Sequence, residues 1–289
     1  MKLGNEKLKE IVLSDSKNHF FVKDESVNPS GSIKDLPVFT ILNSFKEKGY
    51  FAKECTVIEA TSGNTGISLA YFQKEFGYKA IIVLPITASQ GRKDLIKSYN
   101  AELIECEGGM KGCVDKVNEL LQKIPNSHVL DQFNQELNVL SHVEITAPQI
   151  YKALDKVDYV FAGIGTGGTI SGIAIYSKKN NKDTKLIGVE PAESPLISKG
   201  EAHPHKIEGI GANFIPNILK RDLLDSVITV SYGEALKFCK ILHSNGLFNG
   251  ATSGANLAAA YKYAIEHSLE NKNIVIILPD KGDRYVWSN

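Results

Sequence analysis

The sequence lacks a surplus of either charge. Its 289 residues include 33 Lys and Arg residues and 33 Asp and Glu residues, and its isoelectric point is near 7.0. Proteins that bind nucleic acids or anionic membranes through general electrostatics carry a strongly basic surface. The neutral balance and the lack of a Lys/Arg-rich run therefore argue against nucleic-acid and membrane partners.

Cysteines and long apolar segments are also scarce. The four cysteines, Cys55, Cys106, Cys113 and Cys239, form no CxxC pair, and their spacing suggests no metal site. Such cysteines in a chain of this length are typical of reduced thiols in a cytoplasmic protein. The polar N-terminus lacks the apolar stretch of a secretion signal, and no apolar run approaches the roughly 20 residues of a membrane-spanning helix.

Short apolar runs alternate with amphipathic segments. The runs that predict strands are residues 19–23, 56–60, 80–84, 102–104, 159–163, 186–190, 227–230 and 274–278. The segments that predict helices are residues 37–48, 66–76, 111–121, 233–242 and 256–267. This alternation predicts an α/β fold with mainly parallel sheets and helices on both faces. Residues 131–148 lack a clear strand and are a candidate crossing between two lobes.

Four turns rich in Gly, Ser and Thr lie after or near the predicted strands. They are NPSGSIKD at residues 28–35, TSGNTG at 61–66, GIGTGGT at 163–169 and GATSGAN at 250–256. Ligands of parallel α/β sheets bind beyond the carboxyl ends of the strands. A single such turn is as often a plain connector, but four together favour a ligand site.

The GIGTGGT turn has two interpretations. It follows a strand and opens a helix, so its N–H groups would attract an anion such as a phosphate. Gly163, Gly165 and Gly168 also satisfy GxGxxG, and Glu190 ends the next strand, as in a dinucleotide-binding site. This turn alone leaves a nicotinamide-dependent oxidoreductase open.

Lys34 separates the two interpretations. A lysine at the start of a helix is most often a solvated surface residue. However, the positive end of the helix and desolvation both lower a lysine pKa from its reference near ~10.4. A lysine that is partly neutral can form a Schiff base with an aldehyde. Pyridoxal 5'-phosphate (PLP) has an aldehyde and a phosphate, so it accounts for both Lys34 and GIGTGGT.

With these motifs in place, the sequence resembles the fold type II PLP enzymes, in particular their cysteine synthase and cystathionine β-synthase branch. The resemblance extends over nearly the whole chain. Beyond the turns at residues 28–35, 61–66 and 165–169, it rests on the following residues and motifs: Gln132, Phe133, Asn138, His142, GVEPAESP at 188–195, PHKI and GIGA within 204–212, SGAN at 253–256, and ILPDKGDRY at 277–285.

The resemblance implies a two-domain fold like that of the tryptophan synthase β subunit, with twisted, parallel-rich sheets. We expect a smaller N-terminal α/β domain at residues 35–140 and a larger C-terminal α/β domain at residues 141–289. A strand from residues 10–34 would join them, and PLP would lie between them.

The resemblance also implies roles for individual residues. Lys34 would hold PLP and act as the acid and base at the substrate Cα. Gly165, Thr166, Gly167, Gly168 and Thr169 would hold the phosphate, and Asn64 would hydrogen-bond the PLP hydroxyl. The substrate α-carboxylate would be bound by Thr61, Ser62, Asn64, Thr65 and Gln132. No metal is implied.

Ser253 would face the pyridine nitrogen of PLP. A hydroxyl cannot keep this nitrogen protonated as a carboxylate would, so the ring is a weaker electron sink. Prompt loss of a β-leaving group is then favoured over a long-lived carbanion. That property suits β-elimination followed by attack of sulfide or a thiol.

The sequence departs from the family pattern at several positions. Leu36 replaces an arginine, and residues 88–92 read ASQGR in place of MSxER. Asn213 occupies a site that is glycine in typical sulfhydrylases and aspartate in cystathionine β-synthases, so it is a candidate substrate-binding residue. It is equally well explained as an asparagine at positive φ.

The interpretation favoured by the sequence is a cysteine synthase, which converts O-acetyl-L-serine and sulfide to L-cysteine and acetate. The alternatives are an L-cysteine lyase that releases hydrogen sulfide, a cystathionine β-synthase, and a weakened paralogue that serves as a binding partner. The resemblance implies a homodimer and suggests serine acetyltransferase as a protein partner.

Overall fold

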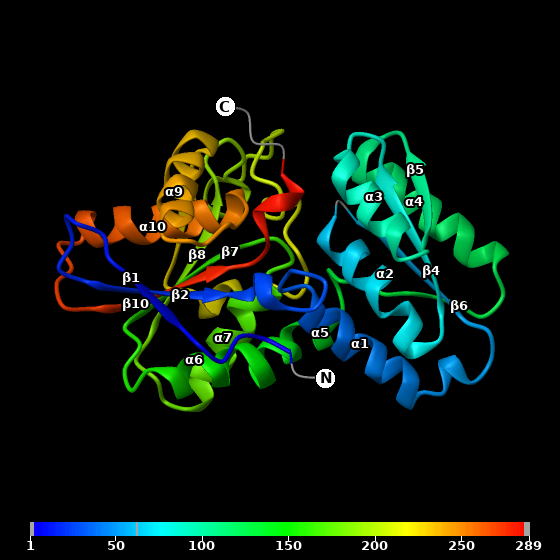
Figure 1. Cartoon of the computed structure of the whole chain (residues 1–289), viewed down its shortest axis with the longest axis horizontal. Helices are drawn as coiled ribbons and strands as arrows, with labels where there is room; N and C mark the ends of the chain where they lie inside the picture. Colours follow the sequence, from blue (N-terminus) through cyan, green and yellow to red (C-terminus); the bar gives the residue numbers. More distant parts are fainter. Residues whose placement is uncertain (1–2, 62, 286–289) are drawn as a thin grey trace.

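Two β-sheets organise the chain in the computed structural model, which describes residues 3–61 and 63–285 (Figure 1). The larger sheet has the order β1-β2-β10-β7-β8-β9 and the smaller one the order β5-β4-β3-β6. The larger sheet comprises β1 (Lys9–Ile11), β2 (His19–Asp24), β7 (Tyr159–Gly163), β8 (Lys185–Pro191), β9 (Ser226–Val230) and β10 (Asn273–Leu278). The smaller comprises β3 (Thr56–Ala60), β4 (Lys79–Pro85), β5 (Glu102–Cys106) and β6 (Ser127–Val129). The β1–β2 pairing is antiparallel and the other pairings are parallel.

Helices cover both faces of each sheet, as the sequence predicts. The smaller sheet packs against α1 (Asp35–Glu47), α2 (Asn64–Phe76) and α3 (Gln90–Ser98) on one face and α4 (Gly109–Lys123) on the other. The larger sheet packs against α6 (Ala147–Ala153) and α7 (Gly168–Lys179) on one face and α9 (Tyr232–Ser244) and α10 (Ala251–Glu266) on the other. The α/β class is therefore confirmed.

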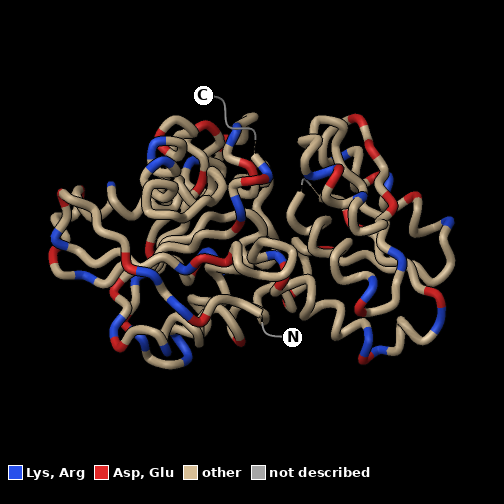
Figure 2. Tube along the Cα trace, viewed as in Figure 1, with Lys and Arg blue, Asp and Glu red and all other residues tan. Residues whose placement is uncertain are grey.

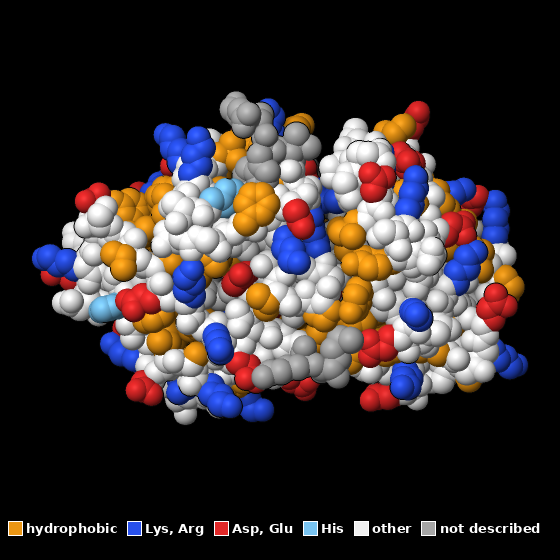
Figure 3. Space-filling model, viewed as in Figure 1, with side chains coloured by type: hydrophobic (Ala, Val, Ile, Leu, Met, Phe, Trp, Pro, Cys, Tyr) orange, Lys and Arg blue, Asp and Glu red, His pale blue; other side chains and the backbone are white. Residues whose placement is uncertain are grey.

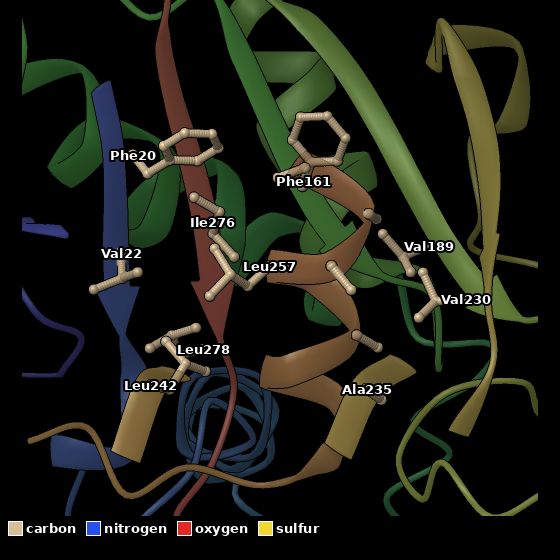
Figure 4. Close-up of a cluster of buried hydrophobic side chains, with 14 of the residues drawn as sticks. Phe20, Val22, Phe161, Val189, Val230, Ala235, Leu242, Leu257, Ile276 and Leu278 are labelled. Atoms are coloured by element: carbon tan, nitrogen blue, oxygen red, sulfur yellow. The ribbon is translucent and has the colours of Figure 1, made fainter. Parts of the chain in front are cut away.

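Continuous apolar strands explain why both faces are covered. In the larger sheet, Phe20, Phe161 and Ile276 come from three different strands and share a buried cluster with Leu257 of α10 (Figure 4). Burying a side chain of this size stabilises the fold by about 1.5–3 kcal/mol. Leu36, which replaces the family's arginine, is fully buried in the core of the smaller sheet.

The structure adds elements that the sequence did not predict, among them helices α3 and α6. The three-residue strands β1 and β6 were not expected, because runs this short carry little periodicity. The GATSGAN segment, expected as a turn, is helical from Ala251 onward, with Gly250 as N-cap. Residues 131–148 contain α5 (Glu136–Ser141) and a π-helical turn, His142–Thr146.

The segment around α5 connects the two sheets. Helix α5 contacts α1 on one side and α7 on the other. This agrees with the expected crossing between lobes. The domain limits 35–140 and 141–289, and the linking role of residues 10–34, stay predictions.

The molecule has two halves, one built around the larger sheet and the other around the smaller sheet. Charges of both signs are interspersed over both halves (Figure 2). On the face shown in Figure 3, hydrophobic side chains gather where the two halves meet. Among the described residues, no helix has the length and apolar character needed to cross a membrane.

A buried carboxyl group in β3 supports the segment that leads out of the smaller sheet. Glu59 is 3% exposed, and its oxygens accept the backbone N–H groups of Asp131 at 2.9 Å and Gln132 at 3.5 Å. Asp131 has a φ of 56°, so the chain turns sharply here. Burial raises the pKa of Glu59 from 4.5 to about 8.

We predict that Glu59 makes the fold less stable as the pH rises. The folded state holds a proton that the unfolded state releases near pH 4.5, so the stabilisation is complete below this pH and is lost towards pH 8. Relative to Glu59→Gln, the wild type should lose at least about 2 kcal/mol of unfolding free energy between pH 5 and pH 9. Urea unfolding across this range measures the difference. The exposed Glu75→Gln variant is the control and should show no such difference. The prediction is contradicted if the unfolding free energies of the wild type and Glu59→Gln differ by the same amount at pH 5 and pH 9.

Candidate active site

A cavity of about 380 Å³ lies between the two halves of the structure. It opens beyond the carboxyl ends of β3, β4, β7 and β10, where Thr61, Pro85, Gly163, Pro279 and Asp280 form part of its wall. This is the edge at which parallel sheets bind ligands.

Four helices begin at this cavity. The N-cap residues of α1, α2 and α7 are Lys34, Gly63 and Gly167, and all three line the cavity. The N-cap of α10 is Gly250, and Thr252 in its first turn is also a lining residue. Each helix start carries unpaired N–H groups and a partial positive charge. The cavity therefore favours anionic groups.

Lys34 extends into this environment from the start of α1. Its side chain is only partly exposed. Burial lowers the pKa of Lys34 from its usual value, and the negative charge of Asp280 opposes part of this change. The direction agrees with the sequence analysis. Such an amine reaches its nucleophilic, neutral form more readily than a solvated lysine does.

The expected phosphate-binding loop passes close to the rest of the structure at its glycines. Gly167 has a φ of 81°, which side chains rarely adopt. A Cβ on Gly165 would lie 2.3 Å from the carbonyl oxygen of Gly209, and one on Gly168 would lie 2.0 Å from Oδ1 of Asn138. The Nδ2 atom of Asn138 donates to Oγ1 of Thr166 at 3.1 Å. The loop can be built only from glycine at these positions.

Thr169 is held by a buried, neutral histidine. Nε2 of His142 lies 3.2 Å from Oγ1 of Thr169, and Nδ1 lies 2.8 Å from Oγ1 of Thr146. Burial and the positive charges of Lys34 and Lys23 lower the pKa of His142 from 6.5 to about 3. One ring nitrogen therefore donates and the other accepts. If Nε2 donates, the Thr169 hydroxyl keeps its own hydrogen for a ligand.

Asn64 is held from the other half of the structure. Its Nδ2 atom donates to Oδ2 of Asp280 at 2.7 Å, and its Oδ1 atom accepts from Nη1 of Arg284 at 2.6 Å. Asn64 begins α2 beside the smaller sheet, whereas Asp280 and Arg284 follow the last strand of the larger one. These contacts therefore join the two halves across the cavity.

The expected carboxylate-binding residues share one side of the cavity. Thr61, Thr65 and Gln132 all line it. The hydroxyl of Thr65 donates to Oε1 of Gln132 at 2.6 Å, and Oγ1 of Thr61 accepts from the N–H of Gly63 at 3.1 Å. Ser62, assigned to the same group, lies outside the described residues.

Ser253 lies in the first turn of α10, next to Thr252, which lines the cavity; Ser253 itself is not among the lining residues. Its side chain is fully buried. Its hydroxyl oxygen has no hydrogen-bond partner among the described residues. Leaving a buried hydroxyl unpaired is unfavourable, so this atom is a natural contact for a ligand.

Asn213 lies at the exposed rim of the cavity and combines both properties considered from the sequence. It lines the cavity, and its φ is 60°. Its Oδ1 atom accepts a hydrogen bond from the Ser194 hydroxyl at 2.9 Å, which fixes the exposed side chain.

Glu190 does not fit the dinucleotide interpretation. It is 1% exposed, and its carboxylate accepts the backbone N–H groups of Ile197 at 2.8 Å and Ser198 at 2.9 Å. The side chain therefore stabilises the start of α8 (Leu196–Lys199) and is not presented to a ribose.

Comparison with known proteins now identifies the family. The family described as pyridoxal-phosphate dependent enzyme matches residues 7–280. The chain belongs to this family of PLP enzymes. The family, the cofactor and the enzymatic nature predicted from the sequence are therefore confirmed.

Individual PLP enzymes resemble the chain closely. Cysteine synthase B of Campylobacter jejuni is 44% identical over 269 residues, which cover 92% of this chain and 89% of that protein. The structure of a hydrogen sulfide-producing enzyme from Fusobacterium nucleatum is 37% identical, with a TM-score of 0.94, covering 98% of this chain and 96% of that one. An O-acetylserine-dependent cystathionine β-synthase from Helicobacter pylori is 33% identical, with a TM-score of 0.92, covering 99% and 96%.

Sequence reasoning missed several charged residues that the fold brings to this PLP enzyme's cavity. Asp280 and Arg284 fix Asn64, as described above. Arg92 is 4% exposed and forms an ion pair with Glu208 across the mouth of the cavity. The signal that could have pointed to Asp280 is its position one residue beyond a buried strand, within ILPDKGDRY.

We predict that Gly168→Ala destabilises the protein. The new methyl group would displace the Asn138 amide, and overpacking of this kind costs about 1–3 kcal/mol. The control is Gly233→Ala in α9, where a Cβ has open space around it. Because alanine favours helices over glycine by up to about 1 kcal/mol, the control should keep or raise the melting temperature. Thermal unfolding of both variants measures this, and equal stability of the two would contradict the prediction.

Proposed function

We propose that the chain is a cysteine synthase that converts O-acetyl-L-serine and sulfide to L-cysteine and acetate. The observation that supports it most directly is the partly buried Lys34 amine, whose pKa is lowered, in a cavity where four helices begin. The 44% identity to cysteine synthase B of Campylobacter jejuni over 92% of this chain supports the choice of reaction.

The residues of the cavity fit PLP on structural grounds. The glycines at 165, 167 and 168 leave no room for side chains beside the start of α7. The buried Ser253 hydroxyl lacks a protein partner among the described residues. Bound PLP would supply an electron sink that allows the substrate to lose its Cα proton and its β-leaving group.

Lys34 would anchor the cofactor and then move the proton at the substrate Cα. Both tasks need an amine that can be neutral near pH 7. Burial lowers the pKa of Lys34 towards that range, and Asp280 keeps the change from being larger. We therefore assign Lys34 as the catalytic residue.

The phosphate would lie against Gly165, Thr166, Gly167, Gly168 and Thr169. Backbone N–H groups at the start of α7 and the two threonine hydroxyls supply donors without positive side chains. Neutral His142 would orient the Thr169 hydroxyl, because its ring can donate to the hydroxyl oxygen.

The substrate α-carboxylate would be bound at the start of α2 by Thr61, Thr65 and Gln132, with Ser62 assigned by family resemblance. The N–H groups of this helix start favour a carboxylate. Asn64 would donate its remaining N–H to the PLP hydroxyl. Ser253 would contact the pyridine nitrogen, where a hydroxyl favours prompt elimination.

Two related reactions use the same machinery. Release of hydrogen sulfide from L-cysteine is favoured by the Fusobacterium nucleatum structure, and cystathionine synthesis by the Helicobacter pylori one. The choice depends on the leaving group and nucleophile, which enter past the rim that includes Asn213 and Phe214. The weakened paralogue that serves as a binding partner is the least favoured alternative, since Lys34 and the glycine loop are present.

The assembly and the location follow from the same family reasoning. We propose a cytoplasmic homodimer that takes small amino acids and sulfide or a thiol as substrates. Serine acetyltransferase is the proposed protein partner, because it would supply the O-acetylated substrate.

The proposed reaction is tested by comparing kcat/KM for O-acetylserine, O-phosphoserine, serine and cysteine. With sulfide as nucleophile, O-acetylserine should be the best of the first three donors. Faster sulfide release from cysteine than cysteine synthesis from O-acetylserine would replace the proposal by the lyase alternative.

We predict that Lys34→Ala abolishes cysteine formation while the protein stays folded. No other lysine is assigned to the Cα proton, whereas the phosphate donors remain and PLP should still associate. Cysteine assays and circular dichroism measure the two properties, with the exposed Lys240→Ala as control. Full activity of Lys34→Ala would remove the basis of the mechanism.

We predict that Asn213 influences the choice of reaction. Asn213→Asp places a carboxylate base at the rim and should raise sulfide release from cysteine relative to cysteine synthesis, whereas Asn213→Gly should do the reverse. Aspartate and glycine both adopt the positive φ of this position more readily than other residues do. The ratio of the two kcat/KM values should change by more than about twofold, or roughly 0.4 kcal/mol.

The control for this prediction is Asn217→Asp, which adds the same charge on the same loop. Asn217 is exposed and donates to Oδ1 of Asn134 at 2.6 Å. Its variant should keep the wild-type ratio. Equal ratios in Asn213→Asp, Asn213→Gly and the wild type would show that Asn213 is required only for the positive φ at this position.

A further inference from the structure

Asp280 lies where the last strand of the larger sheet meets the loop that carries Lys34. It follows β10 after one residue and forms an isolated antiparallel bridge with Ser32, two residues before the lysine. The N–H of Ile33 donates to the Pro279 carbonyl at 2.7 Å. Asp280 is 1% exposed and lines the cavity. Its position is therefore fixed relative to Lys34.

The carboxylate of Asp280 is anchored on one oxygen. Oδ2 accepts hydrogen bonds from Nδ2 of Asn64 at 2.7 Å and from the Tyr285 hydroxyl at 2.5 Å. Burial keeps the pKa of Tyr285 well above its ordinary value, so this hydroxyl retains its hydrogen and donates. Oδ1 has no hydrogen-bond partner among the described residues and lies by Gly250, at the positive end of α10.

Asp280 and Arg284 together allow only one orientation of the Asn64 amide. The amide nitrogen faces a carboxylate and the amide oxygen faces a guanidinium. A flipped amide would place oxygen against oxygen and N–H against N–H, which replaces two attractive contacts by two repulsive ones. The amide nitrogen has a second hydrogen, and Asn64 lines the cavity.

We propose that Asp280 is a positioning residue for the cofactor: with Arg284, it fixes the Asn64 amide so that the remaining N–H is presented to the PLP hydroxyl beside Lys34. This inference rests on the role proposed above for Asn64. It adds that the residue which orients Asn64 belongs to the other half of the molecule, next to the catalytic lysine. The contact therefore sets Asn64, which begins α2 on the smaller sheet, relative to Asp280, which follows the last strand of the larger sheet and is bridged to the loop before Lys34.

The test is a double-mutant cycle on PLP affinity, measured by equilibrium titration of apoenzyme. Asp280→Ala should weaken PLP binding by at least about tenfold, as should Asn64→Ala. If Asp280 acts through Asn64, the double variant should bind PLP within about threefold of Asn64→Ala alone. A purely structural role would lower affinity additively, and that result would overturn the proposal, as would wild-type affinity in Asp280→Ala.

Asp280→Asn separates the hydrogen bond from the charge. Its amide oxygen can still accept from Asn64 and Tyr285, so PLP affinity should stay within about fivefold of the wild type. A loss as large as that of Asp280→Ala would show that the negative charge near Lys34 matters and not the orientation of Asn64. The matched control is Asp222→Ala, which removes an exposed carboxylate outside the cavity lining and should leave affinity within about threefold.

Two further measurements keep the test decisive if a variant does not fold or if the proposed reaction is wrong. If Asp280→Ala does not fold, the same cycle is measured with Arg284→Lys. This variant removes the guanidinium hydrogen bond to the Asn64 amide oxygen and keeps the positive charge. The proposed reaction is assessed separately, by cysteine formation in the wild type. If the effects of the two variants on PLP affinity are not additive but the wild type forms no cysteine, the proposed reaction is overturned and the role of Asp280 is kept. If the wild type forms cysteine but the effects are additive, only the role of Asp280 is overturned.

Discussion

The positive ends of four helices meet at one cavity, and the chemistry of the site depends on this electrostatic arrangement. Each helix start contributes partial positive charge and unpaired N–H groups. Such helix starts favour a phosphate and a carboxylate through backbone N–H groups. Lys34 lies at one of these helix starts, and burial lowers the pKa of its amine. Asp280 limits the effect, so the lysine can still accept and return a proton.

This arrangement requires the two halves of the molecule to be held at a defined distance, because α2 belongs to one half and α7 and α10 to the other. Apolar contacts reach across the boundary, since Leu137 and Ile145 of the connecting segment pack against the core of the smaller sheet. Polar contacts across the boundary add directional constraints. Asn138 joins Gln132 to Thr166, and Asn64 is bound by Asp280 and Arg284. Hydrogen bonds are directional, which makes them suited to fixing this geometry.

The sequence predicted the features that depend on local pattern. Buried parallel strands are continuous apolar runs, so strands such as β3 and β7 were located correctly, and the α/β class followed from their alternation with helices. The start of α10 was missed because Gly, Thr and Ser are typical of turns, although here they pack into the core. Asp280 was missed because its partner Asn64 lies 216 residues away in sequence. No local pattern indicates a pairing at that separation, and only the folded chain reveals it.

The interior of the site and its rim are subject to different constraints. Inside, Lys34, Gly168 and Asn64 lie at helix starts, so a change in any of them disturbs these starts. None of them is assigned to the leaving group, so this part is compatible with any reaction that removes a β-substituent from a small amino acid. At the rim, side chains such as Asn213 and Phe214 are exposed, and Phe214 packs against Phe133 with ring centroids 4.8 Å apart. In the proposed reaction, replacing a rim residue would alter what approaches the β-carbon and leave the Lys34 amine in place. We therefore expect selection among sulfide, thiol and water to depend on the rim, and β-elimination to depend on the interior.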